Sequence, residues 1–141
     1  APGDPLRLAA AAALDQLLAQ GIAAGRLVIA AEGDLADAAL SAAAERDEVG
    51  GVALLSPNTS NAADLVSATV GLPLLLLAAE GDAFAATAAT AIHGAAPERS
   101  ELRLYPGGAH GADLLAASPQ ALSQTVLWLE GVARAEIVPA D

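Results

Sequence analysis

Acidic residues and one histidine follow short apolar runs at several points along the chain. Glu32 and Asp34 come after one such run, Glu80 and Asp82 after another, and His110 after a third. If these runs are parallel strands of one sheet, their carboxyl ends share an edge, where ligands usually bind in open α/β sheets. The four carboxylates are oxygen ligands suited to a hard divalent cation such as calcium. The alternative is that the acids are simply solvated, since the chain contains 17 Asp and Glu residues.

The elements that would position these residues can be read from the hydrophobic pattern. Leu27–Ala31, Val52–Leu55 and Leu74–Ala79 are nearly continuous apolar runs, as expected for strands buried on both faces of a parallel sheet. Glu101–Tyr105 alternates charged and apolar residues and is predicted to lie near an edge of the sheet. With helical patterns between these runs, we predict an α/β fold. It is a three-layer αβα sandwich with a mostly parallel sheet of about four strands.

Four helices are expected from the apolar spacing. Three of them cover Ala1–Gln20, Asp34–Ala44 and Ala85–Ile92. The last helix begins at Ser118, whose hydroxyl suits an N-cap, and ends at Gly131. Its apolar stripe consists of Leu122, Val126 and Leu129. Residues 1–133 are expected to form one domain, and residues 134–141 a loose tail.

The charge balance limits the classes of partner. The formal net charge is -11, with six arginines and no lysine. A surface this acidic repels phosphate backbones and anionic lipid, so we expect neither a nucleic acid nor a membrane partner. The longest apolar stretch, Val70–Ala79, is well below the ~20 residues of a membrane span. The chain starts at Ala1 and contains no methionine, which suggests an exported and processed protein or a piece of a longer one. The compartment stays open.

Three stretches resemble α/β-hydrolases of the dienelactone-hydrolase type. Gly25–Ala36 (GRLVIAAEGDLA) resembles the family's strand, nucleophile elbow and following helix. Pro73–Asp82 (PLLLLAAEGD) resembles the strand that ends at the acid of the catalytic triad. Leu102–Gly111 (LRLYPGGAHG) resembles the strand and loop that carry the triad histidine. The resemblance covers nearly the whole chain but only the C-terminal half of the family, and it implies a truncated α/β-hydrolase-like fold.

The resemblance implies a site with its nucleophile missing. Asp82 matches the triad acid and His110 the triad histidine, but Gly33 occupies the nucleophile position of the family's Gly-x-Ser-x-Gly elbow. Of the two flanking positions where the family has small residues, Ala31 fits and Leu35 does not. Glycine keeps the positive φ that an elbow needs, but it has no atom that could attack a carbonyl. An ordinary strand-to-helix glycine, with no hydrolase history, is the alternative.

A neighbouring carboxylate could replace the missing serine. Asp34 would then be the nucleophile, as aspartate is in some covalent mechanisms. This requires the elbow to shift by one residue, which places Glu32 where a small residue belongs. The other interpretation is that Asp34 is an acid of the first helical turn.

We therefore expect an α/β-hydrolase-like pseudoenzyme with a binding or assembly role and no organic cofactor. The first alternative is an active esterase-type hydrolase with a substituted or partner-supplied nucleophile. The second is an acidic module that binds a divalent metal ion. Because the family's early strands are missing, Leu27–Ala31 should be an unpaired apolar edge, which is an aggregation hazard. We expect it to be covered by a second copy in a homodimer or by another chain segment.

Overall fold

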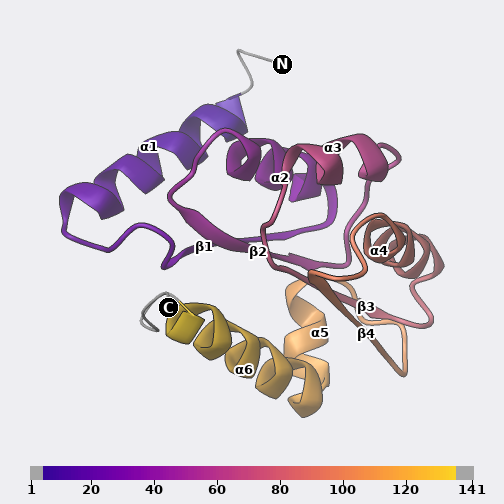
Figure 1. Ribbon diagram of the computed structural model, residues 1–141. Helices are drawn as coiled ribbons and strands as arrows, with labels where there is room; N and C mark the ends of the chain where they lie inside the picture. The colour runs from indigo at the N-terminus through magenta and orange to yellow at the C-terminus, as the bar shows by residue number, and fades with distance from the viewer. Residues whose placement is uncertain (1–4, 136–141) are drawn as a thin grey trace.

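Four parallel strands form one sheet in the computed structural model, which describes residues 5–135 (Figure 1). The strands are β1 (Leu27–Glu32), β2 (Val49–Leu55), β3 (Leu74–Ala79) and β4 (Ser100–Tyr105). They pair in chain order, so β2 and β3 are central and β1 and β4 form the two edges. The predicted α/β class, the parallel sheet and the edge position of the Glu101–Tyr105 run are confirmed.

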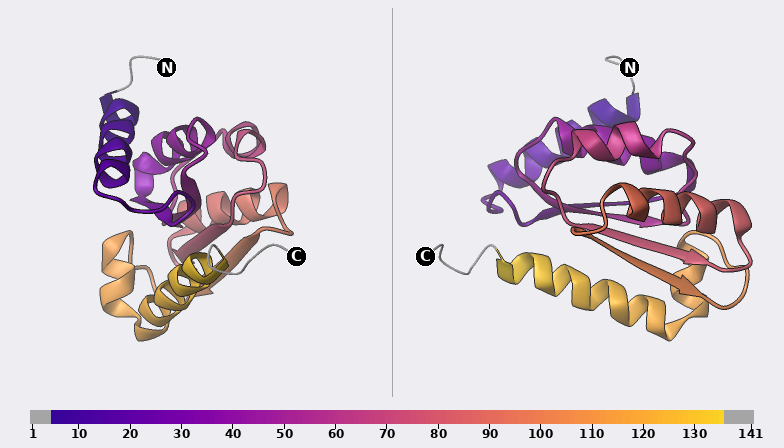
Figure 2. Two further views of the ribbon diagram at one scale, coloured as in Figure 1. Left: turned by 60° about the vertical axis from the view of Figure 1, so that its left-hand side comes forward. Right: turned by 45° about the vertical axis from the view of Figure 1, so that its right-hand side comes forward.

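Helices cover both faces of this sheet, as the turned views in Figure 2 show. They are α1 (Pro5–Ala19), α2 (Ala36–Ala44), α3 (Ala62–Ala68), α4 (Ala83–Ala95), α5 (Ala112–Ala117) and α6 (Pro119–Ala135), with a 3₁₀ turn, η1 (Gly33–Leu35). Alternate residues of a strand point to opposite faces. In β3, Leu74 and Leu76 join a core with α1–α4, whereas Leu75 and Leu77 join a second core with α5 and α6. All six residues of β3 are buried, which explains why this run contains no polar side chain.

Several boundaries differ from the sequence prediction. Strand β2 starts at Val49 and not at Val52, because Gly50 and Gly51 continue the strand. At Gly51 the missing side chain leaves room for a ring, since a Cβ there would lie 2.8 Å from Cη2 of Trp128 on α6. The short helices α3 and α5, of 7 and 6 residues, were not predicted.

The helix ends also differ in places. Helix α4 runs through Gly94 to Ala95, and Asp34 lies in the 3₁₀ turn before α2. Residues 134 and 135 belong to α6, while the rest of the predicted tail and residues 1–4 lie outside the described part. The predicted Ser118 cap is confirmed by the hydrogen bond that Ala121 N donates to Ser118 Oγ at 3.2 Å. Within residues 5–135, no helix has both the length and the apolar character needed to cross a bilayer.

Candidate functional site

The acid and the histidine suggested by the sequence meet at the carboxyl edge of the sheet. Asp82 follows β3 at the amino end of α4, and His110 lies in the loop between β4 and α5. His110 Nδ1 lies 2.5 Å from Asp82 Oδ2, and since a carboxylate only accepts, the ring nitrogen is the donor. The predicted contact between the two is confirmed. The acid is 18% exposed and the imidazole 56% exposed, so the ring is held on one side and open on the other.

The other ring nitrogen of His110 faces Gly33. This glycine begins the turn after β1, is buried and has φ +55, the left-handed conformation that glycine tolerates best. A Cβ built on Gly33 would lie 3.4 Å from His110 Nε2. A side chain at residue 33 would therefore point at the imidazole, on the side opposite Asp82. Within residues 5–135, no serine or threonine hydroxyl is hydrogen-bonded to His110.

The loop that carries His110 is fixed by groups from two other strand ends. Gly111 N donates to Ser56 Oγ at 2.8 Å, and Ala112 N donates to Glu32 Oε2 at 2.5 Å. Ser56 is fully buried and has φ 48, an uncommon conformation for a residue with a side chain. Gly111 has φ 61, a left-handed conformation that glycine tolerates best, and a Cβ there would also displace the Glu32 carboxylate that accepts from Ala112 N.

Sequence reasoning missed this role of Ser56 and Gly111. The sequence offered one signal for Ser56, which is its place directly after β2. Asp34 and Asp82 lie just after β1 and β3 in the same way. Glu32 was proposed as a metal ligand, but its carboxylate accepts the hydrogen bond from Ala112 N.

Asp34 is joined to a different partner. The Asn58 side-chain amide donates to Asp34 Oδ1, and Asn58 N donates to Gly33 O at 3.0 Å. These contacts tie the turn after β1 to the loop after β2. No hydrogen bond joins Asp34 to His110 within the described residues, so the proposal that Asp34 replaces the nucleophile receives no support from the geometry.

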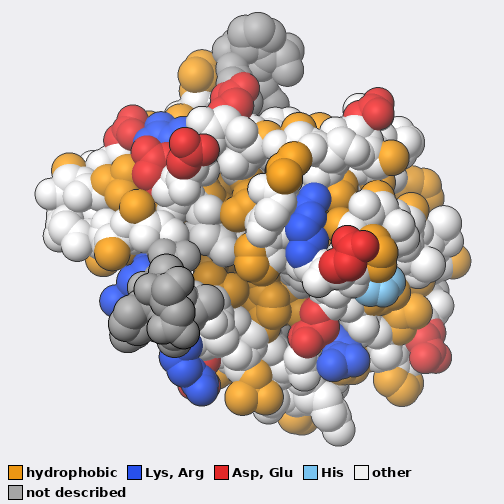
Figure 3. Space-filling model, viewed as in Figure 1, with side chains coloured by type: hydrophobic (Ala, Val, Ile, Leu, Met, Phe, Trp, Pro, Cys, Tyr) orange, Lys and Arg blue, Asp and Glu red, His pale blue; other side chains and the backbone are white. Residues whose placement is uncertain are grey.

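The four carboxylates at the sheet edge do not gather into a metal centre. Residues 5–135 contain no group of three or more His, Asp or Glu side chains placed to hold a metal ion. Glu32 and Asp34 have the partners described above, and Glu80 is exposed. On the face seen in Figure 3, acidic side chains lie singly or in small groups, some beside arginine, and form no single patch.

No protein-family profile, curated protein or solved structure matches this chain. The resemblance to α/β-hydrolases therefore depends on the residues that carry it and on their arrangement at the carboxyl edge.

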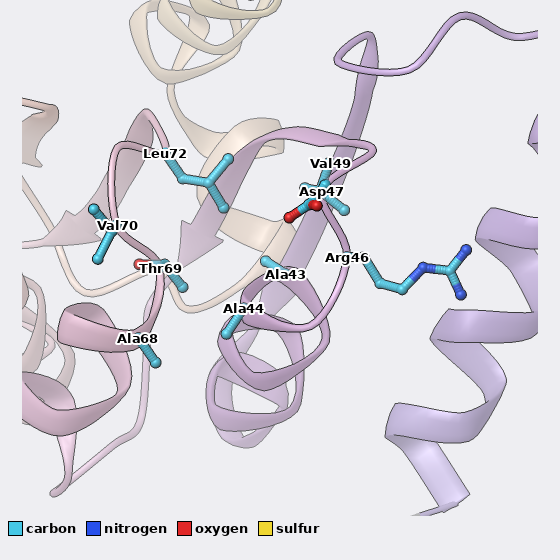
Figure 4. Close-up of a pocket in the computed structure, with 9 residues that line it drawn as sticks. All are labelled: Ala43, Ala44, Arg46, Asp47, Val49, Ala68, Thr69, Val70 and Leu72. Atoms are coloured by element: carbon cyan, nitrogen blue, oxygen red, sulfur yellow. The ribbon is translucent and has the colours of Figure 1, made fainter.

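A hollow of about 300 Å³ lies at the opposite end of the sheet (Figure 4). It is lined by Ala43, Ala44, Arg46, Asp47, Val49, Ala68, Thr69, Val70 and Leu72, which surround the amino ends of β2 and β3. Its one cationic side chain, Arg46, extends away from the hollow, as Figure 4 shows. Arg46 Nη2 donates to Asp15 Oδ1 of α1 at 2.5 Å, and its Nε donates to Glu48 Oε2 at 3.2 Å. The arginine is thus already paired within the protein, and we assign this hollow no function.

Proposed function

We propose that this chain is a non-catalytic α/β-hydrolase-like domain that binds its ligand at the carboxyl edge without cleaving it. One observation supports this above all. The Asp82–His110 pair has the geometry of a proton relay, but the position that its free nitrogen faces is Gly33, which has no side chain. An imidazole oriented by a carboxylate acts by taking a proton from a nucleophile. With no hydroxyl at residue 33, the pair is left as a hydrogen-bonding group for a bound molecule.

The charges next to Gly33 in the sequence also support a site without acyl-transfer activity. Acyl transfer builds negative charge on an oxygen that must be stabilised by preorganised donors. Here the glycine is flanked in sequence by Glu32 and Asp34. An oxyanion beside these carboxylates is disfavoured by like charge. A neutral hydroxyl or amide group has no such cost and can pair with the open nitrogen of His110.

Ester hydrolysis tests the missing catalysis. We would compare p-nitrophenyl acetate hydrolysis by the unaltered chain, His110→Ala and His93→Ala. The control histidine, His93, contacts Ser100 Oγ at 2.7 Å. In a working relay, loss of a triad residue lowers kcat by roughly 10⁴-fold or more. We expect the three proteins to have equal rates within error. A rate that falls only in His110→Ala would overturn the proposal.

Ligand titration tests the binding role. Phenylacetamide is a suitable neutral probe because it offers a carbonyl and an amide next to an apolar ring. We expect millimolar phenylacetamide to shift the NMR signals of the His110 ring and of the Gly33 amide, and we expect no such shift in His110→Ala. If neither signal moves in the unaltered chain, the binding role at this edge is wrong.

A further inference from the structure

The two edges of the sheet differ in the side chains that they present. Edge strand β4 carries Glu101 and Arg103, which form an ion pair at 3.8 Å. Charged side chains are a usual way of blocking a sheet edge. Edge strand β1 has no charge before Glu32 at its end, and within residues 5–135 it pairs only with β2. Of the two edges, that of β1 is therefore the one suited to pairing with a further strand.

The register of the sheet shows which backbone groups of β1 are open. Successive residues of a strand direct their N–H and C=O groups to opposite sides. Val52 N donates to Pro73 O next to β3, so the groups of Ala53 face β1. Ala53 is the register partner of Ala30, and a parallel ladder bonds it to the two neighbours of that partner. Val28 and Ala30 therefore direct their N–H and C=O groups to the side without a neighbouring strand.

Two copies of β1 can pair with each other through these groups. In a hydrogen-bonded antiparallel pair, residues that direct their N–H and C=O groups toward the partner strand lie opposite each other. When Val28 of one copy lies opposite Ala30 of the other, a two-fold axis passes between the two Ile29 residues. The same register places Arg26 of each copy opposite Glu32 of the other. Every open position between these two residues is then matched.

The charges at the two ends of β1 suit this register. Arg26 directly precedes the strand and Glu32 ends it, and both residues are exposed. Among the described residues, Arg26 has no ion-pair partner. Glu32 accepts from Ala112 N through Oε2, and a carboxylate can accept at its second oxygen as well. Antiparallel pairing thus brings an unpaired cation to a carboxylate at both ends, and a register shifted by two residues would lose this match.

Apolar side chains line the edge that this pairing would cover. Beside β1 is a slot of about 140 Å³, in which every lining side chain is apolar: Leu6 and Ala10 of α1, Ile29, Ala30 and Ala31 of β1, and Leu35, Ala38 and Ala39 of η1 and α2. Leu6 is 51% exposed and Leu35 is 42% exposed. A strand laid along β1 would remove part of this surface from water, which is the main favourable term in most protein association.

We propose that the β1 edge is the contact between two copies of this chain, which pair β1 with β1 in antiparallel orientation and join their sheets. A strand of another sequence would also satisfy the open backbone groups, but the charges at both ends of β1 are matched by β1 itself. The proposal does not depend on whether the His110 site binds or cleaves a ligand.

Sedimentation velocity tests the association. We expect the unaltered chain to be a dimer at tens of micromolar. Ala30→Pro removes an N–H from the open edge and leaves the bonds to β2 in place, so it should give a folded monomer by far-UV circular dichroism. The matched control, Ala30→Val, keeps the N–H and should remain a dimer. A monomeric unaltered chain, or a dimer that a folded Ala30→Pro leaves intact, would overturn the proposal.

Single cysteines test the register, since the chain contains none of its own. At the two-fold axis the two Ile29 residues form a non-hydrogen-bonded pair with Cα atoms about 4.5 Å apart, within reach of a disulfide. Ala31 lies on the same face, but its two copies would be about 13 Å apart along the strands. We expect copper–phenanthroline to crosslink Ile29→Cys and not Ala31→Cys. Equal crosslinking of the two variants, or none of Ile29→Cys, would overturn the register.

A charge reversal tests the match at the strand ends. Arg26→Glu replaces attraction to Glu32 of the other copy with repulsion at both ends, and we expect it to raise the Kd of the dimer about tenfold. Arg103→Glu makes the same change of charge on the β4 edge and should leave the Kd unchanged. Equal weakening by the two variants would indicate a general effect of net charge and would contradict the pairing of Arg26 with Glu32.

Discussion

Gly33→Ser is the most direct test of the proposal that the site is inactive. The Cβ of the new serine would lie 3.4 Å from His110 Nε2, an ordinary van der Waals distance, so its hydroxyl can reach the imidazole without moving the loop. The substitution would place serine, histidine and Asp82 in the order of a catalytic triad. We nevertheless expect no gain in ester hydrolysis, because the carboxylates of Glu32 and Asp34 flank residue 33 and disfavour the negative charge of an oxyanion.

The expected magnitudes follow from the backbone and the charges. A residue with a Cβ at φ +55 costs about 1–2 kcal/mol of folding free energy relative to glycine. A new hydrogen bond to His110 would offset about 0.5–1.5 kcal/mol of this. The net loss is small and should lower Tm by no more than about 6 °C. In catalysis, one preorganised oxyanion donor contributes about 10²–10³-fold in rate, and the carboxylates of Glu32 and Asp34 oppose that stabilisation.

The assay is p-nitrophenyl acetate hydrolysis, followed together with thermal unfolding. Gly33→Ala is the matched control, because it has the same backbone strain without a hydroxyl. We expect Gly33→Ser and Gly33→Ala to hydrolyse the ester at equal rates. The reasoning is refuted if Gly33→Ser is far faster than Gly33→Ala and if adding His110→Ala removes the difference.

Three further predictions concern the fold at the end of the sheet opposite to the site. Gly51→Ala would bring a methyl group to 2.8 Å from the Trp128 ring and should cost about 1–3 kcal/mol in urea unfolding. Arg99→Met should cost about 1–3 kcal/mol in the same assay, because Arg99 donates to two backbone carbonyls and one hydroxyl around the end of α3. The pKa of Glu48 is held below its ordinary value of 4.5 by its own backbone N–H and then by Arg46. This stabilisation is present above pH 4.5 and is lost as the pH falls through the lowered pKa, so Glu48→Gln should flatten the acid limb of a stability-against-pH curve.

The strands and the central pair of the site could be predicted because their signals are local. A run such as Leu74–Ala79 is buried on both faces, and its composition alone indicates this. Once the strands are parallel, residues that follow them must share an edge, which brings Asp82 and His110 together. The order of parts along the chain therefore carried enough information for this contact.

The hydrogen bonds that hold the His110 loop left no local signal beyond the position of Ser56 directly after β2. Gly111 and Ser56 are 55 residues apart, and Ala112 and Glu32 are 80 apart. The donors in both hydrogen bonds are backbone N–H groups, which nearly every residue has, so the sequence does not mark which of them meets Ser56 or Glu32. Helices α3 and α5 were missed for a related reason. At 7 and 6 residues, they are too short for apolar periodicity to stand out and depend on packing against the rest of the fold.

These supports explain how the site keeps its shape without a nucleophile. The ring of His110 is oriented by Asp82, and its loop is held by Ser56 and Glu32, so residue 33 contributes nothing to its position. In a catalytic triad all three side chains take part in the reaction. Here the position of the His110 ring depends on Asp82, Ser56 and Glu32, and not on residue 33. In the function proposed above, the absence of a side chain at residue 33 removes the reaction and leaves the oriented imidazole as a hydrogen-bonding group. An imidazole that is already oriented loses less conformational entropy when a ligand binds, which is the physical reason that we propose binding without catalysis at this site.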